Sequence, residues 1–401
     1  MPKTQVGIIG AGPAGLVLAH LLAQQGIESV VIEKHSRDYI EHRVRAGLLE
    51  HRTVELLDRH GLGERMLREG AVHRGTEFRT NGERYRLPYS DLYGGRRMLV
   101  YPQQELVADL VRLRLDAGAP IVFEAADVMP LDIEGPQPRI RYTVDGQAEE
   151  LDCDIIAGCD GFHGVSRDAV PPGALNFYDQ HLPFGWLGIL AAVGPSTSEI
   201  IYALHDRGFA GHMLRTDTVS RFYLQCAPED DPNDWADDVI WDELQRRLAT
   251  PGWTLSEGPI IEKTVAELRS FVTEPMQYGR LFLAGDAAHI APPTGAKGMN
   301  LAIADVEVLA GALGDWYLTG DDVGLQSYSD TCLRRVWRVQ EFSTWMSWML
   351  HRPPDDMPGA AFHRKMQEAR LEYVCTSTAA GTSFAENYVG IEWPAIEAGK
   401  E

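Results

Sequence analysis

The chain has 401 residues, 44% of them hydrophobic and 24% charged, which is the balance of a soluble globular protein with two or three domains of roughly 150 residues each. Its 37 Lys and Arg against 58 Asp and Glu give a net charge of −21, which argues against binding to nucleic acid or to an anionic membrane surface. Five scattered cysteines without C-x-x-C spacing argue against a disulfide framework or a zinc site, so we expect no metal and a cytoplasmic protein.

The first 33 residues carry the pattern of a strand, a helix and a second strand. Residues 5–9 are apolar and rich in β-branched side chains, residues 14–25 are mostly Ala, Leu and Gln, and residues 29–32 form another apolar run that ends at Glu33. Two strands joined by a helix predict a parallel βαβ unit. Because glycines divide the apolar stretch 6–23, we expect neither a secretion signal nor a membrane span there.

The turn between this strand and this helix has the sequence Gly10-Ala11-Gly12-Pro13-Ala14-Gly15. Glycines in such a turn let backbone amides approach a pyrophosphate at the positive end of the helix, and a carboxylate about 20 residues later accepts from a ribose hydroxyl. Glu33 stands at that position and would oppose a phosphate on the ribose. The pattern predicts bound FAD or NAD rather than NADP, with a tight turn that holds no ligand as the alternative.

Two further apolar runs, residues 155–159 and 281–284, each lead to an acidic residue beside a glycine, Asp160 and Asp286. Strands that end in this way usually end at a site. Between them, strand-like segments separated by turn residues predict a mainly antiparallel sheet at about residues 176–270. From Asn300 onward the pattern is helical, over residues 301–318, 326–350 and 360–379.

Three motifs that follow one another in a fixed order point to a family. They are the glycine turn, Cys159-Asp160-Gly161 with Ser166-Arg167, and Gly285-Asp286-Ala287-Ala288-His289 with Pro292-Pro293 and Gly298-Met299-Asn300. With segments 43–47, 207–209, 292–298 and 386–390, the chain resembles the flavoprotein aromatic hydroxylases over nearly its whole length, above all those that act on 4-hydroxybenzoate.

This resemblance implies an α/β fold with three parts and a homodimer. The expected parts are a Rossmann-like FAD-binding domain at 1–175, an antiparallel β-sheet substrate domain at 176–270, and a flavin-contacting segment with C-terminal interface helices at 271–401. FAD is expected to lie with its adenosine ribose on Glu33, its pyrophosphate near Arg45 and its ribityl chain along Gln103 and Asp286. The full set of residues implied for FAD is Gly10, Gly12, Ala14, Gly15, Glu33, Arg45, Gly47, Leu48, Gln103, Asp160, Asp286, Met299 and Asn300.

The reaction that the resemblance implies is a single-component hydroxylation that consumes NAD(P)H and dioxygen and proceeds through a flavin hydroperoxide. It would convert 4-hydroxybenzoate to 3,4-dihydroxybenzoate. A phenol of pKa about 10 must lose its proton inside the site, and tyrosine hydroxyls can relay it because they both donate and accept. By resemblance Tyr202 contacts the substrate hydroxyl, Tyr388 comes next, His73 passes the proton to solvent, and Pro293 turns a backbone carbonyl toward the reacting oxygen. Buried structural tyrosines and an exposed loop histidine are the alternative interpretation.

At the other end of the substrate, the resemblance implies that Arg215 binds the carboxylate beside Tyr223, in a pocket that Thr294 and Ala296 help to line. The sequence departs from the family pattern at two positions of this pocket. Met213 stands where a serine hydroxyl is expected and Gly211 where a leucine is expected. A para-substituted benzoate remains the expected substrate, and 4-aminobenzoate is the alternative to 4-hydroxybenzoate.

The reductant is expected to reach the flavin from a surface groove formed by Lys34, Arg43, His163 and Arg269. Basic residues in the segment after Glu33 could pair with a 2′-phosphate, whereas Glu41 would oppose it. The sequence leaves NADH and NADPH open. A flavin-binding redox sensor without turnover is the competing hypothesis from another functional class.

Overall fold

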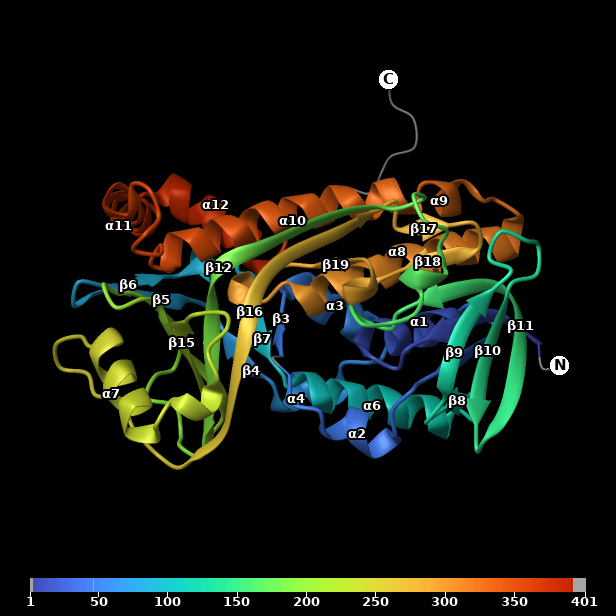
Figure 1. The fold of residues 1–401 in the computed structure, drawn as a ribbon, viewed down its shortest axis with the longest axis horizontal. Helices are drawn as coiled ribbons and strands as arrows, with labels where there is room; N and C mark the ends of the chain where they lie inside the picture. Colours follow the sequence, from blue (N-terminus) through green and yellow to red (C-terminus); the bar gives the residue numbers. More distant parts are fainter. Residues whose placement is uncertain (1–2, 46, 392–401) are drawn as a thin grey trace, which may run out of the picture.

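A computed structural model describes residues 3–45 and 47–391, so residues 392–401 of the predicted C-terminal segment lie outside the described residues. Within these described residues, the fold consists of two eight-stranded sheets, a small three-stranded sheet and helices, several of them at the C-terminal end (Figure 1). This arrangement confirms the predicted α/β class with an antiparallel sheet and helices at the C-terminus. Among the described residues, no helix has the length and apolar character that a membrane span requires.

The first sheet has the strand order β17-β18-β11-β1-β2-β8, in which β18, β11, β1, β2 and β8 are parallel and β17 is antiparallel to β18. In addition, β10 pairs antiparallel with β11, and β9 pairs antiparallel with β10. The predicted βαβ unit is present, since β1 pairs in parallel with β2. The strands of this sheet are β1 (Lys3–Ile9), β2 (Ser29–Ile32), β8 (Ile121–Val122), β9 (Ala126–Leu131), β10 (Arg139–Val144), β11 (Gln147–Gly158), β17 (Gln277–Tyr278) and β18 (Leu281–Leu283).

The register of this sheet gathers the three motifs at one edge. Ile9 pairs with Gly158, and Gly158 pairs with Leu283, so the carboxyl ends of three parallel strands stand side by side. The glycine turn, Asp160 and Asp286 follow those three ends. The helices α1 (Pro13–Gln24), α6 (Gln103–Asp116) and α8 (Gly298–Thr319) pack together beside this sheet.

The second sheet has the order β19-β16-β12-β15-β14-β13-β5-β6. All its pairs are antiparallel except β13 with β5, which is parallel. Its strands are β5 (Thr76–Thr80), β6 (Glu83–Leu87), β12 (Asn176–Ala191), β13 (Ile200–Leu204), β14 (Ala210–Thr216), β15 (Val219–Cys226), β16 (Ile260–Glu274) and β19 (His289–Ile290). Residues 76–87 therefore extend the sheet that the sequence predicted for residues 176–270.

The two long strands β12 and β16 run together across the molecule, from beside α7 (Asp237–Arg247) to α10 (Tyr328–Leu350), as Figure 1 shows. One face of the sheet packs on α7 through Phe222, Ile240 and Leu244. A second hydrophobic cluster joins the sheet to α10 and α12 (Thr378–Val389) and contains many aromatic side chains. Tyr202 belongs to this second cluster, and Met213 and Tyr223 pack against it; all three are predicted site residues.

The C-terminal helices differ from the prediction at one point. The helix expected at 360–379 is divided into α11 (Ala360–Thr376) and α12, because Ser377 adopts an extended conformation and its hydroxyl accepts from the amide of Ala380. Sequence periodicity missed α12. A short helix, α9 (Val323–Gln326), precedes α10.

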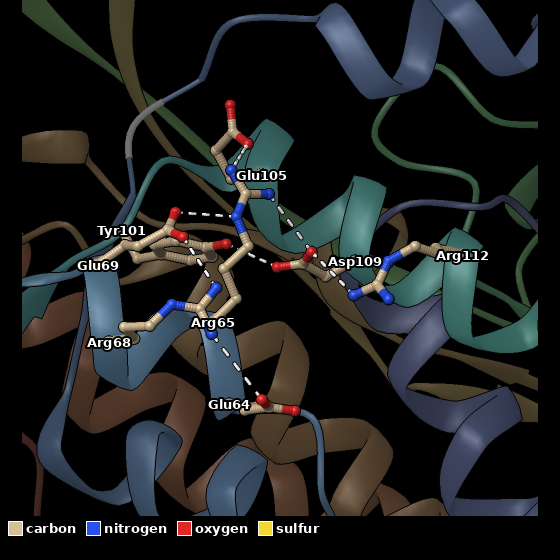
Figure 2. Close-up of polar contacts among 8 residues, drawn as sticks. All are labelled: Glu64, Arg65, Arg68, Glu69, Tyr101, Glu105, Asp109 and Arg112. Carbon is tan, nitrogen blue, oxygen red and sulfur yellow. Dashed lines mark hydrogen bonds and ion pairs between the residues drawn. The ribbon is translucent and has the colours of Figure 1, made fainter.

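A small third sheet has the strand order β3 (Leu48–Leu49), β7 (Met98–Val100) and β4 (Ala71–His73). The same part of the chain, between β2 and β8, also contains the helices α2 (Arg37–His42), α3 (His51–Arg59), α4 (Glu64–Glu69) and α5 (Tyr89–Leu92). Figure 2 shows how Arg65 of α4 holds the start of α6. Its guanidinium lies 2.6 Å from Glu105 and 3.4 Å from Asp109, and the Tyr101 hydroxyl donates to Asp109 over 2.6 Å. This network fixes the N-terminus of α6, where Gln103 and Gln104 lie.

Candidate active site

One large cavity of about 820 Å³, partly open to solvent, lies between the edge of the first sheet and a face of the second. Sites for small ligands usually measure about 300–1,000 Å³, so this cavity is at the upper end of that range and has room for a large ligand such as a dinucleotide. The predicted residues that line it are Gly10, Gly12, Ala14, Glu33, Lys34, Arg43, Arg45, Gly47, Leu48, Gln103, Asp160, His163, Tyr202, Met213, Arg215, Tyr223, Arg269, Asp286, Pro293, Thr294, Ala296 and Met299. Five predicted residues do not line it: Gly15, His73, Gly211, Asn300 and Tyr388.

The glycines of the first turn serve two different purposes. A Cβ on Gly10, whose φ is 103°, would lie 2.4 Å from the carbonyl oxygen of Cys159, and a Cβ on Gly15 would lie 2.0 Å from that of Gly10. These two positions require glycine for packing. Gly12 instead faces open space, with no atom within 4 Å of a Cβ built there. No side chain caps α1, so its first amides remain available to an anion in the cavity.

Glu33 holds the glycine turn to the end of β2. Its Oε2 atom accepts from the amide of Ala11 over 2.8 Å, and its Oε1 atom accepts from the amide of His35 over 2.8 Å. A carboxylate oxygen can accept more than one hydrogen bond, so a ribose hydroxyl can still donate to it. The same side chain therefore shapes the turn and faces the cavity.

The two aspartates at the strand ends have different surroundings. Oδ2 of Asp160 accepts from the amides of Val165 and Ser166 over 2.7 and 2.9 Å, while its buried Oδ1 has no partner among the described residues. Asp286 is open to the cavity. Partial desolvation raises the pKa of Asp286, an effect that His289 and Arg45 oppose.

Arg167 connects these two acidic turns, because its guanidinium donates to the carbonyl oxygen of Ala287 over 2.7 Å. Arg43 and Arg45 lie on the cavity and make no ion pair within residues 3–45 and 47–391. Burial and the neighbouring Arg43 lower the pKa of Arg45. Two arginines without counter-ions beside an open helix N-terminus form a strong anion-binding region.

Asn300 acts behind the cavity wall. Its side-chain amide donates to the carbonyl oxygens of Leu48 and Ala296 over 3.0 Å each, and its Oδ1 accepts from the amide of Glu50 over 2.9 Å. All the hydrogen-bonding groups of this side chain are thus used to hold β3 against α8. Leu48 itself lies on the cavity with its backbone fixed.

Lys297 was not among the predicted site residues, although it belongs to segment 292–298, one of those that carry the family resemblance. Lys297 is 1% exposed, lines the cavity, and donates to Glu50 over 2.5 Å and to the carbonyl oxygen of Tyr388 over 2.8 Å. Trp186, Arg221 and Gln104 also line the cavity without having been predicted. A buried lysine among apolar residues cannot be identified from local sequence, because its partners lie 247 and 91 positions away.

The pocket face of the second sheet alternates tyrosine and glycine along one row of paired residues. Tyr202 pairs with Gly211, Gly211 pairs with Tyr223, and Tyr223 pairs with Gly188. Side chains in one such row point to the same face of a sheet. Tyr202 and Tyr223 therefore lie on either side of Gly211 of β14, and both side chains project toward the cavity.

Tyr202 meets Tyr388 of α12 across this pocket. Their hydroxyl oxygens are 2.8 Å apart, and the two residues are separated by 186 positions. Tyr202 is 1% and Tyr388 0% exposed, and burial raises the pKa of both hydroxyls, so both are neutral groups that can donate and accept. The predicted pair of relay tyrosines thus lies in hydrogen-bond contact, with Tyr202 on the cavity and Tyr388 behind it.

Arg215 lies at the opposite end of the same pocket. Its guanidinium donates to the carbonyl oxygen of Arg45 over 3.2 Å and to Oε1 of Gln104 over 3.1 Å. Neither Arg215 nor the neighbouring Arg221 pairs with a carboxylate in the described part of the chain. Burial and Arg221 lower the pKa of Arg215. An arginine with donors left over in such surroundings favours a bound carboxylate.

The two departures from the family pattern have clear positions. Met213 lines the cavity and pairs with Arg221 across β14 and β15. Gly211 does not line it, because the ring of Phe209 lies 3.1 Å from where a Cβ on Gly211 would stand. Phe209 therefore fills space that a side chain at 211 would take.

His73 is buried in β4 with 2% exposure, and its Nδ1 atom has no partner among the described residues. Burial lowers its pKa, an effect that Glu199 partly opposes. The alternative interpretation of His73 as an exposed loop residue is therefore wrong.

The predicted coenzyme groove lies on the rim of the cavity. Lys34, Arg43 and His163 are exposed there. Arg269 pairs with Asp179, and its guanidinium lies over the ring of Phe162 at 4.3 Å. Phe162 also stacks edge-on against His163, so an aromatic and cationic cluster borders the opening.

Comparisons with known proteins agree with this geometry. A family model described as an FAD binding domain matches residues 3–343. The chain is 45% identical over 392 residues, covering 98% of this chain and 96% of the other, to a p-hydroxybenzoate hydroxylase of Acinetobacter baylyi. This chain belongs to the FAD-binding aromatic hydroxylase family. As a family member it is an FAD-dependent monooxygenase, and the predicted cofactor FAD is confirmed.

Other relatives are more distant. A probable NADH-specific resorcinol 4-hydroxylase of Rhodococcus jostii is 27% identical over 79% of this chain and 59% of its own length. The crystal structure of p-nitrophenol 4-monooxygenase PnpA from Pseudomonas putida superposes with a TM-score of 0.80 at 19% identity, covering 98% of this chain and 100% of that one. At this identity the structural match supports the hydroxylase fold.

The described residues fit FAD. Gly12 leaves open space in front of the uncapped end of α1, Arg43 and Arg45 lack counter-ions, and Glu33 and Asp286 present carboxylates to the same cavity. We therefore propose, as the sequence predicted, that the glycine turn and Arg45 bind the pyrophosphate, Glu33 the adenosine ribose, and Asp286 with Gln103 the ribityl chain.

Proposed function

We propose that this monooxygenase hydroxylates 4-hydroxybenzoate to 3,4-dihydroxybenzoate, with NAD(P)H as reductant and dioxygen as co-substrate. The observation that carries the proposal is the polarity of one pocket face. A hydrogen-bonded tyrosine pair lies at one end and an arginine with no carboxylate partner lies at the other. A ring with a hydroxyl and a carboxylate in para positions is complementary to these two ends. The 45% identity to a p-hydroxybenzoate hydroxylase supports the same substrate.

When bound, FAD would carry electrons from NAD(P)H to dioxygen, so that one oxygen atom of dioxygen is added to the ring carbon beside the hydroxyl and the other leaves as water. The residues of the chain prepare the ring for this transfer. Arg215 binds the carboxylate, and Tyr202 accepts the hydrogen bond of the phenol and passes its proton toward Tyr388. Loss of that proton makes the ring electron-rich, which an attack on an electrophilic oxygen requires.

The remaining pocket residues position the ring. Thr294 donates to or accepts from Ser347 over 2.6 Å, which fixes the turn that contains Pro293 and Ala296. Tyr223 packs against Trp186 with ring centroids 4.5 Å apart. We assign Pro293 the backbone carbonyl that faces the reacting oxygen and these side chains the walls of the pocket.

A second candidate substrate is 4-aminobenzoate, because it carries the same carboxylate for Arg215 and because Met213 changes the fit at that end of the pocket alike for both acids. The thioether of Met213 cannot donate a hydrogen bond to the substrate carboxylate, whereas a serine hydroxyl could. The carboxylate therefore has one hydrogen bond fewer in this pocket. Both compounds carry the carboxylate, and they differ at the group that meets Tyr202.

The test is turnover by the purified yellow holoenzyme with each reductant in turn. We expect 4-hydroxybenzoate to stimulate the oxidation of NADH or NADPH and 3,4-dihydroxybenzoate to accumulate in equal amount, as measured by absorbance and chromatography. Product from 4-aminobenzoate alone would move the assignment to that substrate. Oxidation that no aromatic acid stimulates would favour a redox sensor. Arg215→Gln is expected to weaken substrate binding, with Arg84→Gln, an exposed arginine of β6, as matched control.

We also propose a homodimer formed through α11. Three large apolar side chains on this helix, Phe362, Met366 and Tyr373, are 70%, 48% and 59% exposed and share one helical face by their spacing. Light scattering on Phe362→Glu/Met366→Glu against the unmodified enzyme tests this assembly. The same mass for both would argue against it.

The three-part division at 1–175, 176–270 and 271–401 and a cytoplasmic location remain further proposals. A cytoplasmic location is supported by the free cysteines, which are Cys153, Cys159, Cys226, Cys332 and Cys375. Cell fractionation tests the location, and limited proteolysis that cuts near residues 175 and 270 would support the division.

A further inference from the structure

Tyr89, the first residue of α5, lies beside the relay pair and was not among the predicted residues. It is 1% exposed, and its ring centroid lies 5.6 Å from that of Tyr388 at an angle of 51°. It belongs to the same hydrophobic cluster as Tyr202, Tyr388 and Phe78. A third buried tyrosine thus adjoins the inner end of the relay.

The backbone of α5 also reaches the strand of His73. The amide of Ser90 donates to the carbonyl oxygen of Arg74 over 3.0 Å, so the residue after Tyr89 is bonded to the residue after His73. Tyr89 therefore stands between Tyr388 on one side and the His73 segment on the other. No hydrogen bond connects Tyr388 directly to His73 in the described residues.

The path continues to the surface at Glu199. A Cβ on Gly75 would lie 2.8 Å from Oε1 of Glu199, so this carboxylate abuts the same His73 segment. Glu199 pairs with Arg86 over 2.6 Å, and the Arg86 side chain is 52% exposed. A polar group connected to solvent therefore lies at the outer end.

One buried polar group along this path lacks a partner, since the Nδ1 atom of His73 has none among the described residues. Within the same residues the Tyr89 hydroxyl makes no hydrogen bond, and it is not fully enclosed. Buried polar groups in proteins are nearly always paired, with protein or with ordered water, so the Nδ1 atom of His73 has a free place for a hydroxyl or a water as hydrogen-bond partner. Burial keeps His73 a neutral acceptor by lowering its pKa and keeps Tyr89 a neutral hydroxyl by raising its pKa.

We propose that Tyr89 is the relay residue that carries the substrate proton from Tyr388 to His73 and the Glu199 edge. The inference rests on the proposed function, since it concerns the phenolic proton of 4-hydroxybenzoate. The phenol gives its proton to Tyr202, each hydroxyl passes one proton outward and receives another, and His73 releases one proton to solvent. The net change is a bound phenolate and one proton released, with no electron transferred.

The test is Tyr89→Phe in the full-length holoenzyme, which removes only a hydroxyl. Oxidised enzyme is mixed with 4-hydroxybenzoate in a weakly buffered solution with an indicator dye, and the rate of proton release is followed by stopped flow. We expect release to slow by about tenfold or more, because positioned proton carriers contribute about 10²–10⁴-fold to proton transfer and a water chain replaces only part of it. Tyr93→Phe, on the residue that follows α5, is the matched control and is expected to keep the original rate.

A pH series distinguishes a role of Tyr89 in proton transfer from a purely structural role. The defect of Tyr89→Phe is expected to vanish as the pH approaches about 10, where the phenol is ionised before it binds. The double variant Tyr89→Phe/Tyr388→Phe is expected to be no slower than Tyr388→Phe alone, because both groups serve one path.

Three results would overturn the inference. Release from Tyr89→Phe at the original rate, a defect that does not change with pH, or multiplicative defects in the double variant would each exclude Tyr89 from the path. If the unmodified enzyme bound 4-hydroxybenzoate without releasing a proton and formed no product, the proposed function itself would fail, and this outcome is distinct from the other three.

Discussion

The Nε2 atom of His289 lies 2.6 Å from Oδ2 of Asp305, and both side chains are 1% exposed. The same carboxylate oxygen accepts from the amide of Gly285 over 3.0 Å. Asp305, on α8, therefore holds the turn that presents Asp286 to the cavity, although it does not line the cavity itself.

Asp305→Asn is expected to loosen this turn and weaken FAD binding. A buried donor left without its full partner costs about 1–3 kcal/mol, and Asp305 accepts from both Gly285 and His289. We expect a lower unfolding temperature and a raised dissociation constant for FAD, measured by thermal unfolding and by fluorescence titration of the apoprotein. Asp315→Asn, at an exposed position of the same helix, should change neither quantity. Unchanged FAD affinity in Asp305→Asn would show that the pair has no part in holding the cofactor turn.

Glu33→Gln tests whether Glu33 shapes the glycine turn as well as meeting the ribose. The amide keeps one acceptor oxygen where the carboxylate has two, so one of the bonds to the amides of Ala11 and His35 is lost. A buried donor left without its partner costs about 1–3 kcal/mol. We expect the apoprotein to be destabilised by that amount in denaturant titration. An effect on FAD affinity alone, with the stability of the apoprotein unchanged, would contradict a role in shaping the turn.

Met213→Ser is expected to raise the affinity for 4-hydroxybenzoate. A hydroxyl at this position adds a charge-assisted hydrogen bond to the carboxylate, worth about 1.5–3 kcal/mol, or roughly tenfold to a hundredfold in dissociation constant. Equilibrium titration of the flavin spectrum measures the change. Because 4-aminobenzoate carries the same carboxylate, its affinity should rise by a similar factor. No gain for either acid would show that Met213 does not set the fit.

His351 makes the fold sensitive to acid. Its ring is 0% exposed, Nδ1 donates to the carbonyl oxygen of Ser347 over 2.8 Å and Nε2 accepts from Trp186 over 2.5 Å, so it must stay neutral to fit. Burial lowers its pKa from 6.5 to about 3. Because the unfolded chain binds the proton more tightly, stability is full above about pH 6.5 and falls as the pH drops from there toward about 3.

The expected loss from this one histidine is about 2 kcal/mol by pH 5, since one unit of pKa difference corresponds to about 1.4 kcal/mol. His351→Gln cannot take up a proton, so its unfolding temperature should fall less between pH 7 and pH 5 than that of the unmodified enzyme, even though the variant is less stable at pH 7. His363→Gln, an exposed histidine of α11, should keep the original slope. Parallel slopes for all three proteins would refute the explanation.

The sequence by itself determined the features that depend on local pattern. The glycine turn with Glu33 indicated a dinucleotide, and the apolar runs 155–159 and 281–284 indicated strands that end at a site beside Asp160 and Asp286. The family followed from the order of these motifs. Each motif is a short segment, whose conformation short-range sterics and hydrogen bonding largely set, and the order of the motifs along the chain can be read without the structure.

Only the tertiary structure decided which distant side chains meet. It joined residues 76–87 to the second sheet, placed Tyr388 of the missed helix α12 against Tyr202, and left Arg215 bonded to the FAD-binding segment without a carboxylate partner. It also buried His73 and brought Tyr89 next to the relay. These contacts arise because burial of apolar surface by hundreds of residues together lowers the free energy of the folded chain. Local sequence periodicity does not predict which distant surfaces pack against one another.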